Sequence, residues 1–102
     1  MTNNLLAGLA PAHPGEFLRE DVFPALNKPM AEFARLLGTS RTTLYAIMNG
    51  DQAVTSDMAC KIGKLTGTAP EMWMNLQQAY DLRQSETRLA DELKKIPTLE
   101  AA

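Results

Sequence analysis

The side chains best suited to recognise a ligand lie close together, between Ser40 and Ala46 of a 102-residue sequence. Arg41 carries a planar guanidinium that can donate two hydrogen bonds to O6 and N7 of a guanine, a contact worth about 1–3 kcal/mol of discrimination between bases. Thr42 can bond a base edge or place its methyl group against a thymine methyl, and Tyr45 can reach a base or the sugar-phosphate chain. We therefore predict contacts with double-stranded DNA by five residues: Ser40, Arg41, Thr42, Tyr45 and Ala46.

Two residues of this set, and the neighbouring Met48, also allow an interpretation without DNA binding. Arg41 can be a solvated charge in the first turn of its helix, and the ring of Tyr45 can pack against the helix that follows. Met48 is expected to lie in the core because it falls on the apolar side of the same helix.

The elements that must position these side chains are two short helices joined by a tight turn, over residues 30–49. Ala34 falls where two crossing helices touch, and Gly38 can take the positive φ that ends the first helix. Leu44 and Ile47, three apart on the second helix, are expected to face apolar residues of the first. This helix-turn-helix pattern leaves one face of the second helix free to enter a major groove.

Three further helices complete an all-α, five-helix prediction. The first runs from Pro14 to about residue 23 and is ended by Pro24. Thr39 or Ser40 caps the recognition helix, which stops at the Asn49-Gly50 turn signal. The fourth helix begins after Thr55 and ends at Gly67. The apolar residues that carry these predictions are Phe17, Leu18 and Val22 in the first helix and Met58, Ile62 and Leu65 in the fourth.

The fifth helix is predicted to open with a capping box, in which Thr68 and Glu71 satisfy free N–H groups reciprocally. Its first half is expected to pack inward, in the core or at an interface, through Met72, Trp73, Leu76, Ala79 and Tyr80. Beyond Leu82 the apolar residues thin to Leu89, Leu93 and Ile96 among many charges, and Pro97 ends the helix signal. So sparse a stripe suits a protruding helix that meets a partner, or a tail that frays.

The chain therefore divides into a flexible arm at 1–12, a helix-turn-helix domain at 13–82 and a C-terminal extension at 83–102. Cys60 is the one cysteine and His13 the one histidine. An intramolecular disulfide is excluded, and neither a metal site nor a cofactor is expected. Cys60 is predicted to be a small buried hydrophobe, and His13 to cap or pack at the first helix. These residues provide no basis for an enzyme.

Charge limits how the protein can hold nucleic acid. The net charge is −2 and the pI is about 5.3, which argues against coating nucleic acid through bulk positive charge. Residues 27–52 carry three cations and two anions, a local charge of +1. DNA binding is therefore expected to depend on a homodimer and on specific contacts. With no membrane span and no basic secretory start, we expect a cytoplasmic protein.

Four blocks in this order resemble the HigA-type (VapI-like) antitoxins, a branch of the phage-repressor-like (XRE) helix-turn-helix proteins. They are HPGEFLRE at 13–20, GTSRTTLYAIMNG at 38–50, AVTSDMA at 53–59 and TGTAPEMWMNLQQAYDL at 66–82. The resemblance implies a lambda-repressor-like fold and a dimer that represses its own operon and neutralises a RelE-like mRNA-cleaving toxin. It also implies phosphate contacts by Thr43 and Asn49.

The sequence departs from the family pattern at two places. Asp51 and Gln52 follow the turn where a basic residue is common, and Lys28-Pro29 replaces a helix-opening Ser or Thr, which leaves Met30 at a polar phosphate-contact position. Both changes predict a weaker grip on phosphates. Two other functions remain open: a free-standing transcriptional regulator without a toxin, and a protein-interaction module that no longer binds DNA.

Overall fold

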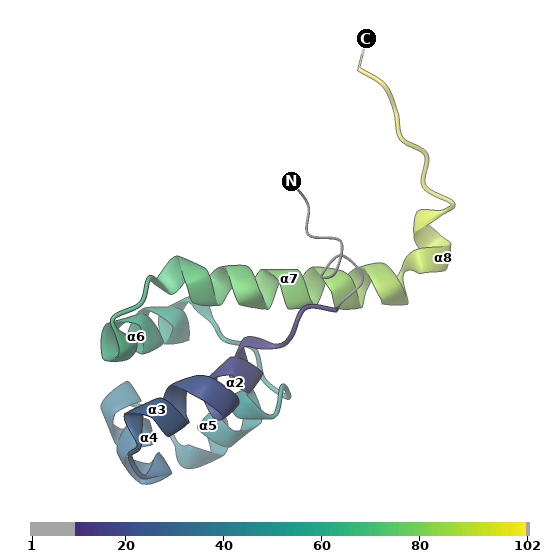
Figure 1. Ribbon diagram of the computed structural model, residues 1–102. Coiled ribbons are helices and arrows are strands. Elements are labelled where there is room, and N and C mark those ends of the chain that lie inside the picture. The colour runs from purple at the N-terminus through teal and green to yellow at the C-terminus, as the bar shows by residue number, and fades with distance from the viewer. Residues whose placement is uncertain (1–9, 102) are drawn as a thin grey trace.

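The computed structural model describes residues 10–101, and within that range the chain is helical with no strand (Figure 1). The predicted all-α class is confirmed. The predicted arm lies outside the described residues up to residue 9. The elements are α2 (Pro14–Phe17), the π-helical turn η1 (Leu18–Val22), α3 (Phe23–Leu26), α4 (Met30–Leu37), α5 (Arg41–Met48), α6 (Ser56–Thr66), α7 (Pro70–Arg88) and α8 (Ala90–Leu93).

The first helix does not end at Pro24, so that prediction is wrong. α2, η1 and α3 follow one another without a break to Leu26, and Asn27 in the left-handed conformation, with φ of 52°, ends the run. Proline lacks an N–H and its ring clashes with the carbonyl four residues earlier in a regular α-helix. Here the wider π turn directly precedes Phe23 and Pro24, and the Phe23 N–H bonds to the Leu18 carbonyl. The wider turn lets the helix continue past the proline.

Most of the predicted helix ends are confirmed. The Ser40 side chain caps α5 by accepting a hydrogen bond from the Thr43 N–H, and Thr55 caps α6 through the Met58 N–H. Gly38 and Gly67 end α4 and α6 with φ of 65° and 73°. Because left-handed backbone favours glycine, these two residues fix where each helix stops.

The predicted capping box at the start of α7 is wrong. Ala69 occupies the N-cap position, and no side chain caps the helix. The Thr68 hydroxyl instead accepts a hydrogen bond from Trp73 Nε1 at 2.8 Å, and it shares a second one with the Thr66 hydroxyl at 2.7 Å. A buried indole N–H needs an acceptor, and this requirement takes the threonine away from the helix end.

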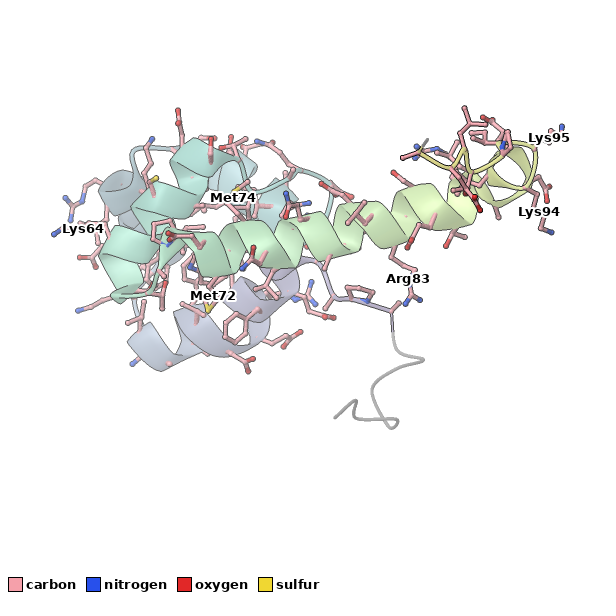
Figure 2. All side chains as sticks on the ribbon, turned by 90° about the horizontal axis from the view of Figure 1, so that it is seen from above. Lys64, Met72, Met74, Arg83, Lys94 and Lys95 are labelled. Carbon is pink, nitrogen blue, oxygen red and sulfur yellow. The ribbon has the colours of Figure 1, made fainter. Side chains whose placement is uncertain are left out.

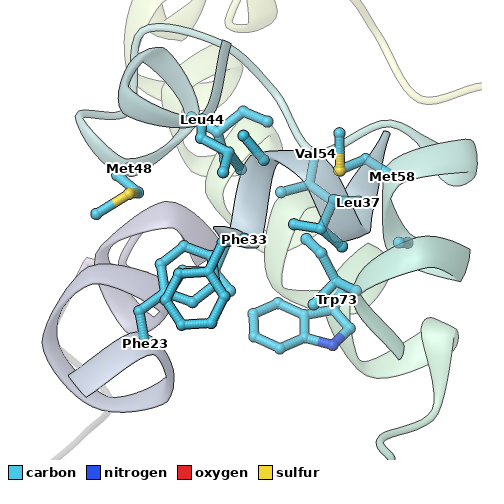
Figure 3. Packing of buried hydrophobic residues seen from close by; sticks show 13 residues of the cluster. Phe23, Phe33, Leu37, Leu44, Met48, Val54, Met58 and Trp73 are labelled. Atoms are coloured by element: carbon cyan, nitrogen blue, oxygen red, sulfur yellow. The ribbon is translucent and has the colours of Figure 1, made fainter. Parts of the chain in front are cut away.

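One core joins the helices, as Figure 3 shows. The rings of Phe23 and Phe33 stack with centroids 4.2 Å apart, and Trp73 of α7 is completely buried. Leu44 and Ile47 of α5 are also buried, in the same cluster as the apolar face of α4. The predictions that Leu44 and Ile47 face the preceding helix, that Met48 lies in the core, and that Trp73 packs in the core or an interface are confirmed. Cys60, predicted to be buried, is instead exposed, because it lies on the outer side of α6.

α7 extends far beyond the core (Figure 1). Trp73 is buried and Tyr80 half-buried, whereas Ala79, predicted to pack inward, is exposed. The helix stops at Arg88, and Leu89, with φ of −95° and ψ of 7°, separates it from the single turn of α8. The described chain measures 54 × 29 × 26 Å, so the long helix makes the molecule elongated. None of the helices described has the length and apolar content needed to cross a bilayer.

Candidate nucleic-acid interface

The helix α5 has one buried and one exposed face. Leu44, Ile47 and Met48 point into the core, with 0%, 1% and 7% of their surface exposed. Arg41 and Tyr45 lie on the opposite face, where Tyr45 is 48% exposed. The exposed face is free to enter a groove, and the buried face holds it in a fixed direction.

The predicted contact residues lie along α5 and at its two ends, and most of them are exposed. Ser40, Arg41, Thr42, Tyr45 and Asn49 are exposed, and Thr43 and Ala46 are half-buried. Five of the seven predicted residues are thus open to solvent, and the other two are partly covered. Tyr45 is 48% exposed, so about half of its side chain remains open to a ligand.

Two of the predicted polar contact residues, Ser40 and Thr43, are also hydrogen-bonded to each other. Ser40 Oγ accepts from the Thr43 N–H at 3.0 Å and donates to Thr43 Oγ1 at 3.0 Å. The Thr43 hydroxyl keeps its proton free for another acceptor. The structure therefore gives Ser40 a capping role at the first turn of α5 and leaves Thr43 able to donate outward.

Arg41 is the cation on this surface that lacks a carboxylate partner among the described residues. Arg35 lies 3.6 Å from Glu32, and Arg19 lies 3.0 Å from Glu20 and 3.9 Å from Glu16. A guanidinium already bonded to carboxylates has fewer donors for a nucleic acid, whereas Arg41 can offer its full fork. This difference favours Arg41 as the base-reading residue.

Gly15 brings the first helix against α5 and was missed by the sequence analysis. A Cβ atom added at Gly15 would lie 1.7 Å from the Ile47 carbonyl oxygen, so no larger residue fits there without moving α5. Its signal in the sequence is a glycine inside the first turn of a predicted helix, where glycine is otherwise unfavourable. The recognition helix therefore rests directly on the backbone of α2.

Arg19 makes a second contact with α5, at the C-terminal end of that helix. Its Nη1 donates to the carbonyl of Met48 at 3.0 Å, across 29 residues of sequence. The last carbonyls of a helix lack partners within the helix, and a cation there also complements the helix dipole. Arg19 thus serves to position α5, and its sequence neighbourhood gave no sign of this contact.

The loop after α5 is fixed by α7. Gln77, which is 5% exposed, accepts a hydrogen bond from the Val54 N–H at 2.8 Å and donates one to Asp81 at 3.0 Å. Gly50 has φ of 79°, and the Asp51 N–H bonds to the Ala46 carbonyl at 2.8 Å. The long helix is therefore linked by hydrogen bonds to the loop that follows the candidate interface.

His13 connects α2, the loop and α7. Its Nδ1 accepts from the Gly15 N–H at 2.9 Å, which confirms its predicted role as a cap, and its ring meets that of Tyr80 edge-on, with centroids 5.0 Å apart. Burial lowers the pKa of His13 below its ordinary value of 6.5, while the Asp81 carboxylate and a hydrogen bond with the backbone of Gln52 act in the opposite direction. The neutral ring is the form that can cap.

Comparison with known proteins agrees with this geometry. The helix-turn-helix family model matches residues 19–73. An uncharacterised HTH-type transcriptional regulator, YddM, of Escherichia coli (strain K12) is 36% identical over 73 residues, which make up 72% of this chain and 77% of that protein. The family-model match begins at Arg19 in η1, covers α3, α4, α5 and α6, and reaches Trp73 in α7.

Two solved structures extend the likeness to DNA complexes. The antitoxin GraA in complex with its operator is 35% identical, with a TM-score of 0.82 over 100% of this chain and 99% of that one. The Pseudomonas aeruginosa antitoxin HigA with the higBA promoter is 31% identical, with a TM-score of 0.82 over 88% of this chain and 99% of that one. Both similar chains were therefore solved on DNA.

Proposed function

Since the chain belongs to the HigA-type branch of the helix-turn-helix family, we propose that it is a DNA-binding antitoxin of the cytoplasm. It represses its own operon as a homodimer, inserts α5 into the major groove of a palindromic operator, and neutralises a RelE-like mRNA-cleaving toxin. Arg41, Thr42, Tyr45 and Ala46 read the bases. Ser40, Thr43 and Asn49 complete the contact surface at its two ends.

One observation carries the DNA-binding part of this proposal: the exposed face of α5 holds an uncommitted arginine while its opposite face is buried. Arg19 and Gly15 fix the helix from behind. A rigid helix with a free guanidinium is what specific readout requires, because a mobile one would lose entropy on binding.

The homodimer follows from charge. A local excess of +1 around the helix-turn-helix can neutralise few phosphates, whereas two copies double both the base contacts and the electrostatic contribution. A two-fold dimer of this kind places its recognition helices about 34–36 Å apart, to match half-sites one DNA turn apart.

The toxin partner is supported by exposed apolar residues outside the core. Leu82 of α7, Leu93 of α8 and Ile96, which follows α8, are 61%, 47% and 65% exposed. A free-standing regulator would have no need for such residues unless they served its own dimer. Since Leu93 is also available for the dimer, the toxin partner is supported by Leu82 and Ile96 and by the likeness to the antitoxins GraA and HigA.

Operator binding is tested with DNA from the protein's own promoter and the Arg41→Ala variant. We expect a loss of about 5- to 150-fold in affinity for the operator, the equivalent of about 1–3 kcal/mol, with an unchanged melting temperature. Arg88→Ala is the matched control, since Arg88 is an exposed arginine at the far end of α7. Unchanged operator affinity in Arg41→Ala would exclude the docking proposed for α5.

Toxin neutralisation is tested by expressing the neighbouring reading frame alone and together with this chain. The proposal expects arrested growth with mRNA cleavage in the first case, and recovery with a co-purifying complex in the second. A neighbouring product that is harmless, and that does not co-purify, would leave the free-standing regulator as the function.

A further inference from the structure

An open groove lies between α4 and α6, apart from the residues assigned to DNA. It has room for about 520 Å³, and its lining is Leu36, Cys60, Lys61, Lys64 and Leu65. Leu36 is 49% exposed although it belongs to a helix whose other leucine, Leu37, is buried. The groove therefore combines apolar side chains with two lysines, which is the composition of a surface for an acidic, apolar segment.

The charges of this groove restrict what can cover it. Lys61 and Lys64 lie three residues apart on α6, so they share one side of the helix. Both are exposed, and neither takes part in the ion pairs formed within residues 10–101. Two copies of the groove facing each other would bring four lysines together with no carboxylate among the lining residues. An occupant must bring carboxylates together with apolar side chains.

The chain itself carries such a segment at α8. Leu93 is 47% exposed, Asp91 and Glu92 are exposed, and the helix contacts no part of the core. Asp91 lies 4.0 Å from Lys94 in an ion pair that is open to solvent, whereas Glu92 takes part in no ion pair among the described residues. α8 thus offers a leucine beside a carboxylate that has no ion-pair partner, and the exposed Lys94 and Lys95 follow directly.

The position of α8 excludes contact with the groove of its own chain. Figure 2 shows Lys64 at one end of the molecule and Lys94 at the other, and Figure 1 shows α6 and α8 at the same opposite ends. The 19 residues of α7, about 28 Å of helix, separate them. Only a second copy can bring its α8 to this groove in the conformation observed.

We propose that α8 of a second copy occupies the groove between α4 and α6. Leu93 lies against Leu36 and Leu65, and Glu92 faces Lys61 and Lys64. A two-fold axis makes the contact reciprocal, with the two α7 helices running in opposite directions. This inference rests on the homodimer of the proposed function and adds the surfaces that form it.

A charge exchange tests the contact on the full chain. Lys64→Glu and Glu92→Lys are each expected to raise the dimer dissociation constant about tenfold, measured by sedimentation at low salt, because attraction becomes repulsion. The double variant is expected to return to within about threefold of the native value. Lys28→Glu is the matched control, since Lys28 is exposed between α3 and α4. A double variant as weak as either single one would overturn the proposal.

The single cysteine provides an independent readout. Under mild oxidation, Glu92→Cys is expected to form a disulfide between position 92 of one copy and the native Cys60 of the other, identified by mass spectrometry after proteolysis. Gln84→Cys, at an exposed position of α7, is the control and is expected not to reach Cys60. A disulfide that joins position 92 of one chain to position 92 of the other would place the two α8 helices side by side and overturn the proposal.

Two results separate this inference from the proposed function. A native chain that dimerises and binds its operator, together with a Glu92→Cys variant that forms no disulfide to Cys60, overturns the groove contact alone. A chain that stays monomeric at concentrations that saturate the operator overturns the dimer of the proposed function as well. If Lys64→Glu weakens operator binding without changing dimerisation, the lysines belong to the DNA surface and the proposal fails.

Discussion

The helices up to Tyr80 and the chain beyond Leu82 use apolar residues in opposite ways. In the first region Leu18, Leu44 and Trp73 are each 0% exposed, and in the second Ile96 and Leu99 are 65% and 86% exposed. Ile96 and Leu99 follow the last helix, but Leu93 is 47% exposed although it belongs to α8, so helix formation alone does not explain the difference. What differs is whether other helices surround the apolar side chains.

The comparison gives a rule for assigning roles. Within the core region a buried apolar residue stabilises the fold, and the exposed polar residues of α5 are the ones available for binding. Beyond Leu82 the fold does not need the apolar residues, so their exposure points to a partner surface. A substitution should therefore change stability in one region and association in the other.

Replacing Trp73 by alanine is expected to have the largest effect on stability. Its indole is completely buried, packs near Phe17 at a centroid distance of 5.6 Å, and donates to Thr68. Loss of a buried large side chain costs about 3–5 kcal/mol, measured as the unfolding free energy in urea. Leu93→Ala is the matched change beyond Leu82, and it is expected to cost less than about 0.5 kcal/mol. Equal losses would remove the distinction between the two regions.

Gly15→Ala is expected to cost about 1–3 kcal/mol, because the added methyl would overlap the Ile47 carbonyl and displace α5. Operator affinity should fall too at temperatures where the variant remains folded. Gly67→Asn is the control: Gly67 has φ of 73° with no atom near a Cβ, and asparagine tolerates that conformation. If Gly15→Ala leaves both stability and operator affinity unchanged, α5 does not depend on this contact.

Lowering the pH should reduce the stability of the core region, because His13 becomes protonated. Because burial lowers the pKa of His13 below 6.5 in the folded chain, the unfolded chain binds the proton more readily. The contribution of the neutral ring to stability is complete above pH 6.5, and it is lost as the pH falls through 6.5 towards the pKa of the folded state. Protonation also removes the acceptor that caps Gly15.

The measurement is the unfolding free energy of the native chain and of His13→Asn across this pH range. Asparagine offers a side-chain acceptor for a cap but does not titrate. We expect the native chain to lose stability between pH 6.5 and 5 more steeply than the variant. Parallel pH profiles would show that His13 does not titrate with a lowered pKa.

Local chemistry made much of the fold predictable from sequence. Ser40 and Thr55 cap their helices, and Gly38 ends α4, because each acts on backbone atoms within a few residues. The spacing of Leu44 and Ile47 identified the buried face of α5, which in turn gave the exposed face. The candidate interface could be outlined for the same reason, although its contacts with DNA remain predictions.

Contacts between distant residues account for what the sequence did not reveal. Thr68 bonds to Trp73 instead of capping α7, and Gly15 touches the backbone of Ile47. Arg19 reaches the Met48 carbonyl, and Gln77 reaches the Val54 N–H. None of these partners is set by a local pattern, because each depends on which helices lie side by side. The helical run past Pro24 required a π turn, which the residue order does not specify.

Removing the residues after Leu82 is expected to have the smallest effect on stability and yet to abolish the dimer. Few of the deleted residues are even half-buried, and none belongs to the core cluster. The unfolding free energy of the shortened chain should therefore stay within about 0.5 kcal/mol of the native value when both are monomeric. Light scattering should show a monomer, because α8 is gone. A shortened chain that remains dimeric would move the interface to the first half of α7, where Trp73 is fully buried and the half-buried Tyr80 and the exposed Ala79 could contribute. A large loss of stability would instead show that residues 83–101 form part of the folded domain, and the boundary at residue 82 would then be wrong.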